Sequence, residues 1–187
     1  MNDIDKAFIA ALVDGNVERA KKLLMSGANP NTLSSDGATA LAPAAANGHV
    51  EVIKFLLRSG VRAGDADELG VTPLMYAAQS GSIEIVKILI ESGAGVNAAD
   101  LCGWTALMDA VSNRHVDIVK LLLASGANPY VQNINGNTAY DMAIASACKD
   151  IEDLFPQCAE QSMLKQGSAV LVRLRRDIPK HTKRSAV

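Results

Sequence analysis

The chain has 187 residues, of which 49% are hydrophobic but only 4% are aromatic, so we expect a core of small aliphatic side chains. Its three cysteines form no CxxC pair and no even disulfide set, no run of 18 apolar residues occurs, and no signal-peptide pattern stands at the start. These features disfavour a disulfide-rich secreted domain and a membrane-spanning helix. They favour a reducing intracellular compartment, the cytoplasm with the nucleus as an alternative.

Charge divides the chain into two parts. Residues 1–156 carry 11 Lys and Arg against 18 Asp and Glu, whereas residues 157–187 carry 7 against 2. An acidic body with a basic tail is therefore expected, and the change in composition predicts a folded domain over 1–156 followed by a C-terminal tail over 157–187.

Three ladders of residues repeat along the body at a spacing of 33. They are Gly27, Gly60, Gly93 and Gly126; Gly37, Gly70, Gly103 and Gly136; and Thr39, Thr72, Thr105 and Thr138. A fixed period of this length is typical of stacked repeats. We expect five units, at about 1–33, 34–66, 67–99, 100–132 and 133–156.

The units differ in regularity. The first, around "AFIAALVDGNVERAKKLLMSGANPN", has a charged second helix, as a terminal cap should. In the second, Pro43 stands about four residues into a helix, where it removes a hydrogen bond and should shorten or distort that helix. The fifth ends early, at Pro156.

The third unit shows the expected local structure most clearly. Thr72 is suited to cap a first helix that begins at Pro73, and Gly81 should end this helix in a left-handed conformation. Its apolar stripe is Leu74, Ala77 and Ala78. The second helix is expected to turn inward Ile83, Val86, Leu89 and Ile90. Because each helix pair buries only one side, neighbouring pairs must stack into a solenoid.

The third unit, "DELGVTPLMYAAQSGSIEIVKILIESGAGVNA", resembles the ankyrin repeat, whose pattern is D-x-x-G-x-T-P-L-H-x-A-A, then G-H-x-E-V-V-K-L-L-L and G-A-D-x-N-A. The resemblance covers roughly residues 1–155. It implies an all-α ankyrin-repeat solenoid, a curved stack of helix–turn–helix pairs with β-hairpin loops. One departure is that the histidine of the motif is replaced by Ala42, Met75, Met108 and Asp141.

The resemblance also implies a protein–protein interaction module, an adaptor, scaffold or inhibitor, that grips its partner with the hairpin tips and the concave side of the first helices. Carried onto this sequence, the partner-binding residues are Asp36, Glu68, Leu69, Val71, Tyr76, Gln79, Leu101, Trp104, Asp109, Ser112, Asn113 and Asn135.

Apolar residues at the tips of units three to five sharpen this hypothesis. They are Leu69, Val71, Leu101, Trp104 and Ile134. Turn tips in water have no folding reason to be apolar, so a contiguous run indicates a binding patch. With Asp36 and Glu68 as an acidic rim, it would suit an extended partner segment with an apolar side chain between Lys or Arg residues. The alternative is that Trp104, the single tryptophan, only covers the neighbouring loop.

Signatures of catalysis and of metal binding are missing. The sequence contains no GxxxxGK[ST], GxSxG, HExxH or GxGxxG. His49 and His115 lie two units apart, which at about 10 Å per layer is too far to share a metal. Asp67 and Asp100 are interpreted as turn residues rather than as a catalytic pair. We expect no enzymatic activity, no cofactor and no metal.

The leading prediction is a monomeric, non-enzymatic protein that binds another protein. A first alternative is a regulator whose repeats recruit a partner while its basic tail contacts nucleic acid or an anionic membrane. Within the tail, "PKHTKR" resembles a short nuclear import signal, and the tail could also fold back onto the acidic repeats. A further alternative is that the chain is a fragment of a larger multidomain protein.

Overall fold

The computed structural model describes residues 2–35 and 37–155. The basic tail and Asp36 lie outside these residues. Ten helices occur in the described part of the chain: α1 (Asp3–Val13), α2 (Val17–Met25), α3 (Leu41–Ala46), α4 (Val50–Arg58), α5 (Pro73–Ser80), α6 (Ile83–Glu91), α7 (Ala106–Ser112), α8 (Val116–Ala124), α9 (Ala139–Ala145) and α10 (Lys149–Glu152). Its extended pairing is limited to the isolated bridges Leu33–Thr39, Ala99–Thr105 and Gln132–Thr138. The all-α solenoid is confirmed.

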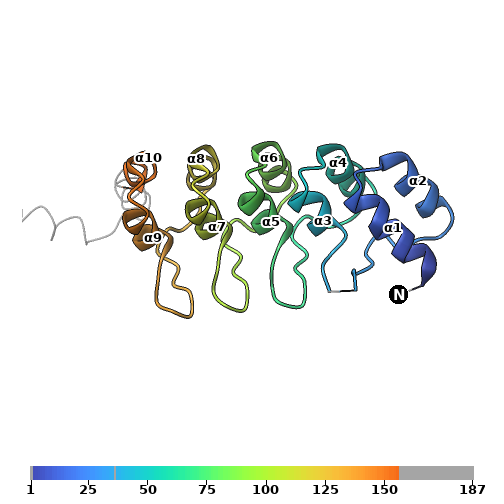
Figure 1. The fold of residues 1–187 in the computed structure, drawn as a ribbon, viewed down its shortest axis with the longest axis horizontal. Coiled ribbons are helices and arrows are strands. Elements are labelled where there is room, and N and C mark those ends of the chain that lie inside the picture. Colours follow the sequence, from blue (N-terminus) through green and yellow to red (C-terminus); the bar gives the residue numbers. More distant parts are fainter. Residues whose placement is uncertain (1, 36, 156–187) are drawn as a thin grey trace, which may run out of the picture.

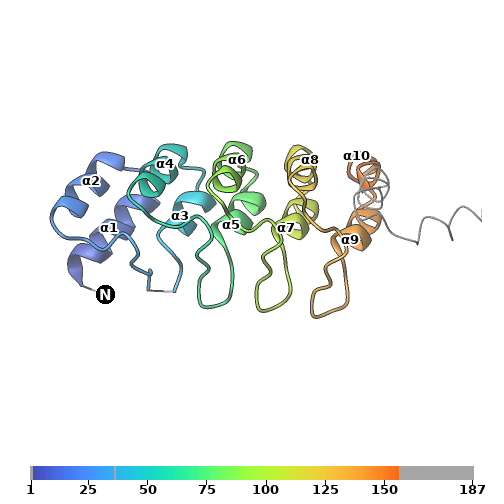
Figure 2. The same cartoon turned by 180° about the vertical axis from the view of Figure 1, so that it is seen from behind.

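The helices form two parallel rows (Figures 1 and 2). The odd-numbered helices make an inner row, in which α1, α3, α5, α7 and α9 each pack on the next, and the even-numbered helices make an outer row in the same order. Each consecutive pair, from α1–α2 to α9–α10, is called a layer here, numbered one to five. The loops that join an outer helix to the next inner helix project away from the inner row, below it in both views.

Threonine caps fix the start of three inner helices. The hydroxyl oxygens of Thr72, Thr105 and Thr138 accept the backbone N–H groups of Met75, Met108 and Asp141 at 3.4, 3.3 and 3.1 Å. Each bond satisfies one of the amides that a helix start leaves without a partner. Pro73 occupies the first helical position of α5, and Gly81 ends it at φ 82°, as the sequence predicts.

Layer two departs from this plan at Pro43. In the other layers the residue in its place donates its N–H to the threonine carbonyl, from Tyr76, Asp109 and Met142 at 3.3, 3.1 and 3.0 Å. Pro43 has no N–H to donate. Helix α3 accordingly starts later and has 6 residues, against 8, 7 and 7 in α5, α7 and α9. The predicted shortening is confirmed, and Thr39 is left with a buried hydroxyl that has no partner in the structure.

The core runs between the two rows. Leu74, Ala77 and Ala78 of α5 are fully buried, as predicted. In α6 the buried side chains are Ile85, Val86 and Leu89, whereas Ile83 is 37% exposed and Ile90 is partly buried. The expected inward position of Ile83 is wrong: at 100° per residue, Ile83 and Ile90 fall on the edge of a face centred between Val86 and Ile85.

Histidines join two pairs of layers. His49 precedes α4 and its Nε2 lies 2.8 Å from the carbonyl oxygen of Val13, while His115 precedes α8 and its Nε2 lies 3.1 Å from that of Gln79. Each ring covers a glycine of the preceding layer, and a Cβ on Gly81 would lie 2.8 Å from Cε1 of His115. The two histidines therefore serve separate layer junctions, in keeping with the structural role expected for them.

Candidate functional site

The loops of layers three and four are shaped by aspartates at equivalent positions. Oδ1 of Asp67 accepts the N–H groups of Leu69 and Val71 at 2.9 and 2.8 Å. Oδ1 of Asp100 accepts those of Cys102 and Trp104 at 2.9 and 2.7 Å. Side chains that bond the backbone of their own turn hold it in place, so the interpretation of both aspartates as turn residues is confirmed.

Neighbouring loops touch through their backbones. The N–H of Leu101 donates to the carbonyl oxygen of Leu69 at 2.9 Å, and that of Ile134 donates to Cys102 at 2.9 Å. This approach requires glycine at Gly103, where φ is 75° and a Cβ would lie 2.8 Å from Cα of Asn133. The loops of layers three to five thus form one continuous surface beside the inner helices.

The predicted apolar patch is divided in two by the structure. Leu69, Leu101 and Ile134 protrude at the loop tips, with exposed fractions of 64%, 72% and 71%. Val71 and Trp104 are instead partly buried and pack against the core. The expectation that all five stand together as protruding tips is wrong, because the last residue of each turn leads back toward the helix that its loop precedes.

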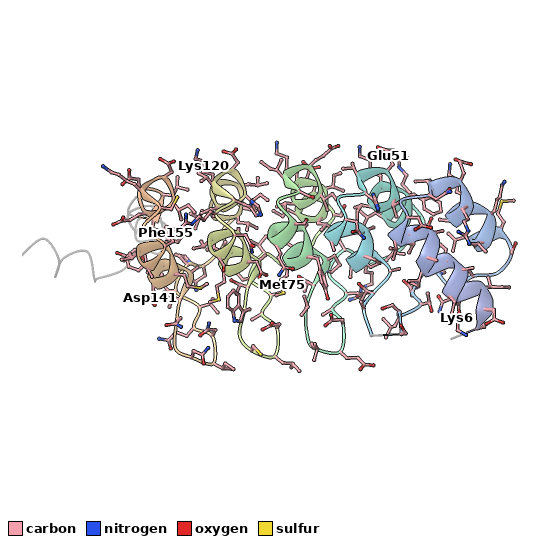
Figure 3. All side chains as sticks on the ribbon, viewed as in Figure 1. Lys6, Glu51, Met75, Lys120, Asp141 and Phe155 are labelled. Atoms are coloured by element: carbon pink, nitrogen blue, oxygen red, sulfur yellow. The ribbon has the colours of Figure 1, made fainter. Side chains whose placement is uncertain are left out.

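A pocket of about 450 Å³ lies between layers three and four. Its lining residues are Val71, Met75, Tyr76, Gln79, Asp100, Cys102, Trp104 and Asp109. Five of them, Val71, Tyr76, Gln79, Trp104 and Asp109, are among the predicted partner-binding residues. Figure 3 shows Met75 on the loop side of α5, whereas Glu51 and Lys120 lie on the far edge of the molecule, along the outer row.

Three lining residues were missed: Met75, Asp100 and Cys102. Met75 was considered only as the substitute for a motif histidine, and Asp100 only as a turn residue. The period carried the missing signal, because Asp100 stands 33 residues after Asp67 and Asp109 stands 33 after Tyr76. Two positions that are neighbours in layer three must be neighbours again in layer four.

This pair of positions differs in charge between the two layers. In layer three, the hydroxyl of Tyr76 donates to Oδ2 of Asp67 at 3.2 Å. In layer four, the same positions hold two carboxylates. Burial, with a further contribution from the charge of Asp100, raises the pKa of the Asp109 carboxyl to about 7. Asp109 is therefore partly protonated at neutral pH and poised to lose its proton when a cation approaches.

The remaining predicted residues lie outside the pocket lining. Ser112 and Asn113 are exposed at the end of α7, where Nδ2 of Asn113 donates to the carbonyl oxygen of Asp109 at 2.9 Å. Leu69, Leu101, Glu68 and Asn135 belong to the loop tips. Glu68 is exposed and covers the preceding loop, since a Cβ on Gly37 would lie 3.3 Å from its Cδ. Asp36 lies outside the described residues.

A second hollow, of about 440 Å³, lies on the side of the outer row and is lined by Leu57, Gly60, Val61, Arg62, Ala63, Gly64, Ser92 and Gly93. It has no aromatic wall, and Nε of Arg62 is already 3.1 Å from Oδ1 of Asp65. A ligand would find fewer unsatisfied groups there, so the pocket between layers three and four is the stronger candidate.

Metal and membrane sites were also sought. Among residues 2–35 and 37–155, no three His, Cys, Asp or Glu side chains converge as metal ligands would. None of the helices in the described ranges combines the length and the apolar character needed to cross a bilayer.

Comparison with protein families matches two parts of the chain. Residues 7–100 match a model described as ankyrin repeats (3 copies), and residues 95–143 match one described as ankyrin repeats (many copies). A search of curated proteins finds no match.

Proposed function

The chain belongs to the ankyrin repeat family, whose repeats are generally protein–protein interaction modules, and on this basis we propose that it binds a segment of a partner protein in the pocket between layers three and four. The segment would continue over the protruding side chains of Leu69 and Leu101. The protein would act by binding alone, as an adaptor, scaffold or inhibitor.

The observation that carries this proposal is that the pocket's large side chains occupy positions where the fold accepts almost anything. The position of Trp104 holds Ala38, Val71 and Asn137 in the other layers. The position of Tyr76 holds Pro43, Asp109 and Met142. Since the solenoid forms with such different residues there, packing alone does not require a tryptophan and a tyrosine side by side, and a binding role accounts for them.

Trp104 is the expected centre of the binding energy. Tryptophan dominates interface hot spots because it buries a large rigid surface, and its truncation typically costs about 2 kcal/mol or more of binding free energy. Leu69 and Leu101 add apolar area at the rim of the same site.

The test is a selection from a random peptide library displayed against the full chain, followed by titration of the recovered peptides. Trp104→Ala should weaken their binding by at least about tenfold, the factor that corresponds to 1.4 kcal/mol. Met25→Ala is the matched control, since Met25 is an apolar residue 89% exposed in layer one, and it should leave the affinity unchanged.

Affinities must be compared per folded molecule, because Trp104 also packs against the core. If the folded fraction of Trp104→Ala binds the peptides as tightly as the wild type, Trp104 is a packing residue, and a binding site elsewhere would have to replace the one proposed.

A further inference from the structure

The pocket between layers three and four has an electrostatic imbalance that the protein itself does not correct. Its walls come from two stretches, residues 64–80 and 94–113, which contain five carboxylates and no Lys or Arg. Those carboxylates are Asp65, Asp67, Glu68, Asp100 and Asp109. A partner that enters here meets a negative surface, which favours a positively charged segment.

Asp109 is the least compensated of these groups. The equivalent residue of layer three, Tyr76, satisfies Asp67 by donating its hydroxyl, but Asp109 offers Asp100 a second negative charge. The side chain of Asp109 receives no hydrogen bond from the described residues. Asp100 uses Oδ1 for both of its turn bonds, so Oδ2 has no donor among them either. Unpaired carboxylates in a partly buried site favour a ligand that brings positive charge and N–H donors.

The nearest basic side chains are committed elsewhere or face another way. Nη2 of Arg114, just after α7, donates to the carbonyl oxygen of Ser146 at 3.0 Å. Lys120 of α8 lies on the far edge of the molecule, 3.6 Å from Asp117 (Figure 3). On α5 and α9 the groups that titrate near the pocket's inner helices are Tyr76, Tyr140 and Asp141, and none of them is cationic.

The remaining walls suit the other parts of a basic side chain. Trp104 and Tyr76 present aromatic rings, which attract ammonium and guanidinium groups over their faces. Val71 and Met75 offer apolar surface along which the methylene stem of Lys or Arg can lie. An apolar side chain would instead bury Asp100 and Asp109 without a partner, which is unfavourable.

We propose, resting on the function proposed above, that this pocket selects a Lys or Arg side chain of the partner segment, which packs against Trp104 and Tyr76 and pairs with Asp109 and Asp100. The apolar side chains of the partner then meet Leu69 and Leu101 at the tips. This reverses the arrangement expected from the sequence, in which an apolar centre was surrounded by an acidic rim.

Because Trp104 is the single tryptophan, its indole N–H resonance and its fluorescence report on this pocket alone. The first experiment titrates the full chain with Nα-acetyl-lysine amide and with Nα-acetyl-arginine amide, using Nα-acetyl-norleucine amide as the uncharged control. The basic compounds should shift the indole signal saturably and the control should not. An equal response to norleucine would overturn the proposal.

The second experiment uses the library-selected peptides. Replacing their shared Lys or Arg by Gln should weaken binding to the wild type at least about fivefold, the effect of a partly desolvated charge pair with a cation–π contact. The same replacement should have little effect on Asp109→Asn. Asp117→Asn, which changes a carboxylate on the outer row, should behave as the wild type.

The outcomes separate this proposal from the one on which it rests. If Trp104→Ala weakens the peptides but Lys or Arg to Gln does not, the protein-binding site stands and the basic specificity is wrong. If neither change matters, the site itself is wrong. If Arg173→Gln, Arg175→Gln and Arg176→Gln together shift the indole signal before any peptide is added, the occupant is the chain's own C-terminal segment and the proposed partner side chain is excluded.

Discussion

Asp109 and Tyr76 stand 33 residues apart at one position of the repeat, and what each does depends on the residue it faces. The hydroxyl of Tyr76 satisfies Asp67, whereas Asp109 raises the local negative charge beside Asp100. A single residue difference between layers therefore turns a closed hydrogen bond into an unpaired charge. The same position holds Pro43 in layer two, so one repeat position accommodates structural and functional variation alike.

The raised pKa of Asp109 predicts how stability depends on pH. The unfolded chain releases this proton near the ordinary value of 3.8, whereas the folded protein holds it until about pH 7. Between these values the folded state binds the extra proton, so the contribution of Asp109 to stability falls as pH rises from about 4 to 7. Asp109→Asn cannot ionise and should be more stable than the wild type at pH 8, with a gain that disappears near pH 4.

We expect a gain of about 1–2 kcal/mol at pH 8, less than the full shift implies because the side chain is partly exposed to solvent. Urea denaturation at pH 4, 6 and 8 measures it. Asp117→Asn, on the exposed side of α8, is the control and should show no pH-dependent gain. A difference between Asp109→Asn and the wild type that is constant across this range would contradict the burial of the carboxyl.

Helices of six to nine residues are too short to persist alone, so the junctions between layers decide whether they form. The junctions are not identical. His115 covers Gly81 between layers three and four, and His49 covers Gly15 between layers one and two. Between layers four and five, Arg114 takes the glycine position at φ 59° and reaches Ser146 instead.

Gly81 and Gly93 provide a matched test of the histidine junction. Both have left-handed φ, 82° and 87°, but nothing lies within 4 Å of a Cβ on Gly93, whereas one on Gly81 would overlap the ring of His115. Gly93→Ala should cost about 1–2 kcal/mol of stability, the price of left-handed backbone for alanine. Gly81→Ala should cost more in thermal and urea unfolding. Adding His115→Ala should remove the excess; equal losses in the two single variants would contradict the junction.

Pro43 governs the length of α3. Pro43→Ala restores an N–H that can donate to Thr39, as in the other layers, a bond that contributes about 0.5–1.5 kcal/mol. The more flexible unfolded chain offsets about 0.4–1 kcal/mol of this. We expect a small net rise in the urea midpoint. Pro30→Ala, in a loop, gains no helical bond and should lower it. A loss of stability in Pro43→Ala as large as in Pro30→Ala would show that α3 does not regain its first turn.

In the whole molecule each layer contacts only its neighbours, so damage should spread from layer to layer rather than through a shared centre. The terminal layers are covered on one side only. The central layers, which carry the proposed site, are covered on both. This arrangement gives the pocket its firmest support where the loops of layers three and four meet.

Leu89→Ala tests this distribution, because Leu89 is fully buried in the central helix α6. It should cost about 2–5 kcal/mol, as truncations of buried leucines do. Ile83→Ala on the edge of the same helix should cost less than about 1 kcal/mol. Amide hydrogen exchange should show the largest loss of protection in layers two to four. Uniform loss across all five layers would indicate one cooperative unit instead of a chain of neighbours.

The sequence alone determined the period, the fold class and most helix ends of this protein. These features depend on residues close together in the chain: a threonine before a helix, a glycine after it and an apolar stripe along it. Repetition at 33 residues then made stacking the only way to bury the remaining apolar faces.

Only the tertiary structure decided how the site is arranged. The sequence selected Val71, Tyr76, Gln79, Trp104 and Asp109, but it grouped Trp104 with the protruding leucines and left Asp100 aside. Whether a loop residue protrudes or lines a pocket depends on the direction of its Cβ and on the packing of the next layer, which the order of residues does not give. The charge conflict between Asp100 and Asp109 likewise arises only when a loop and a helix, nine residues apart in sequence, are brought together in a partly buried pocket.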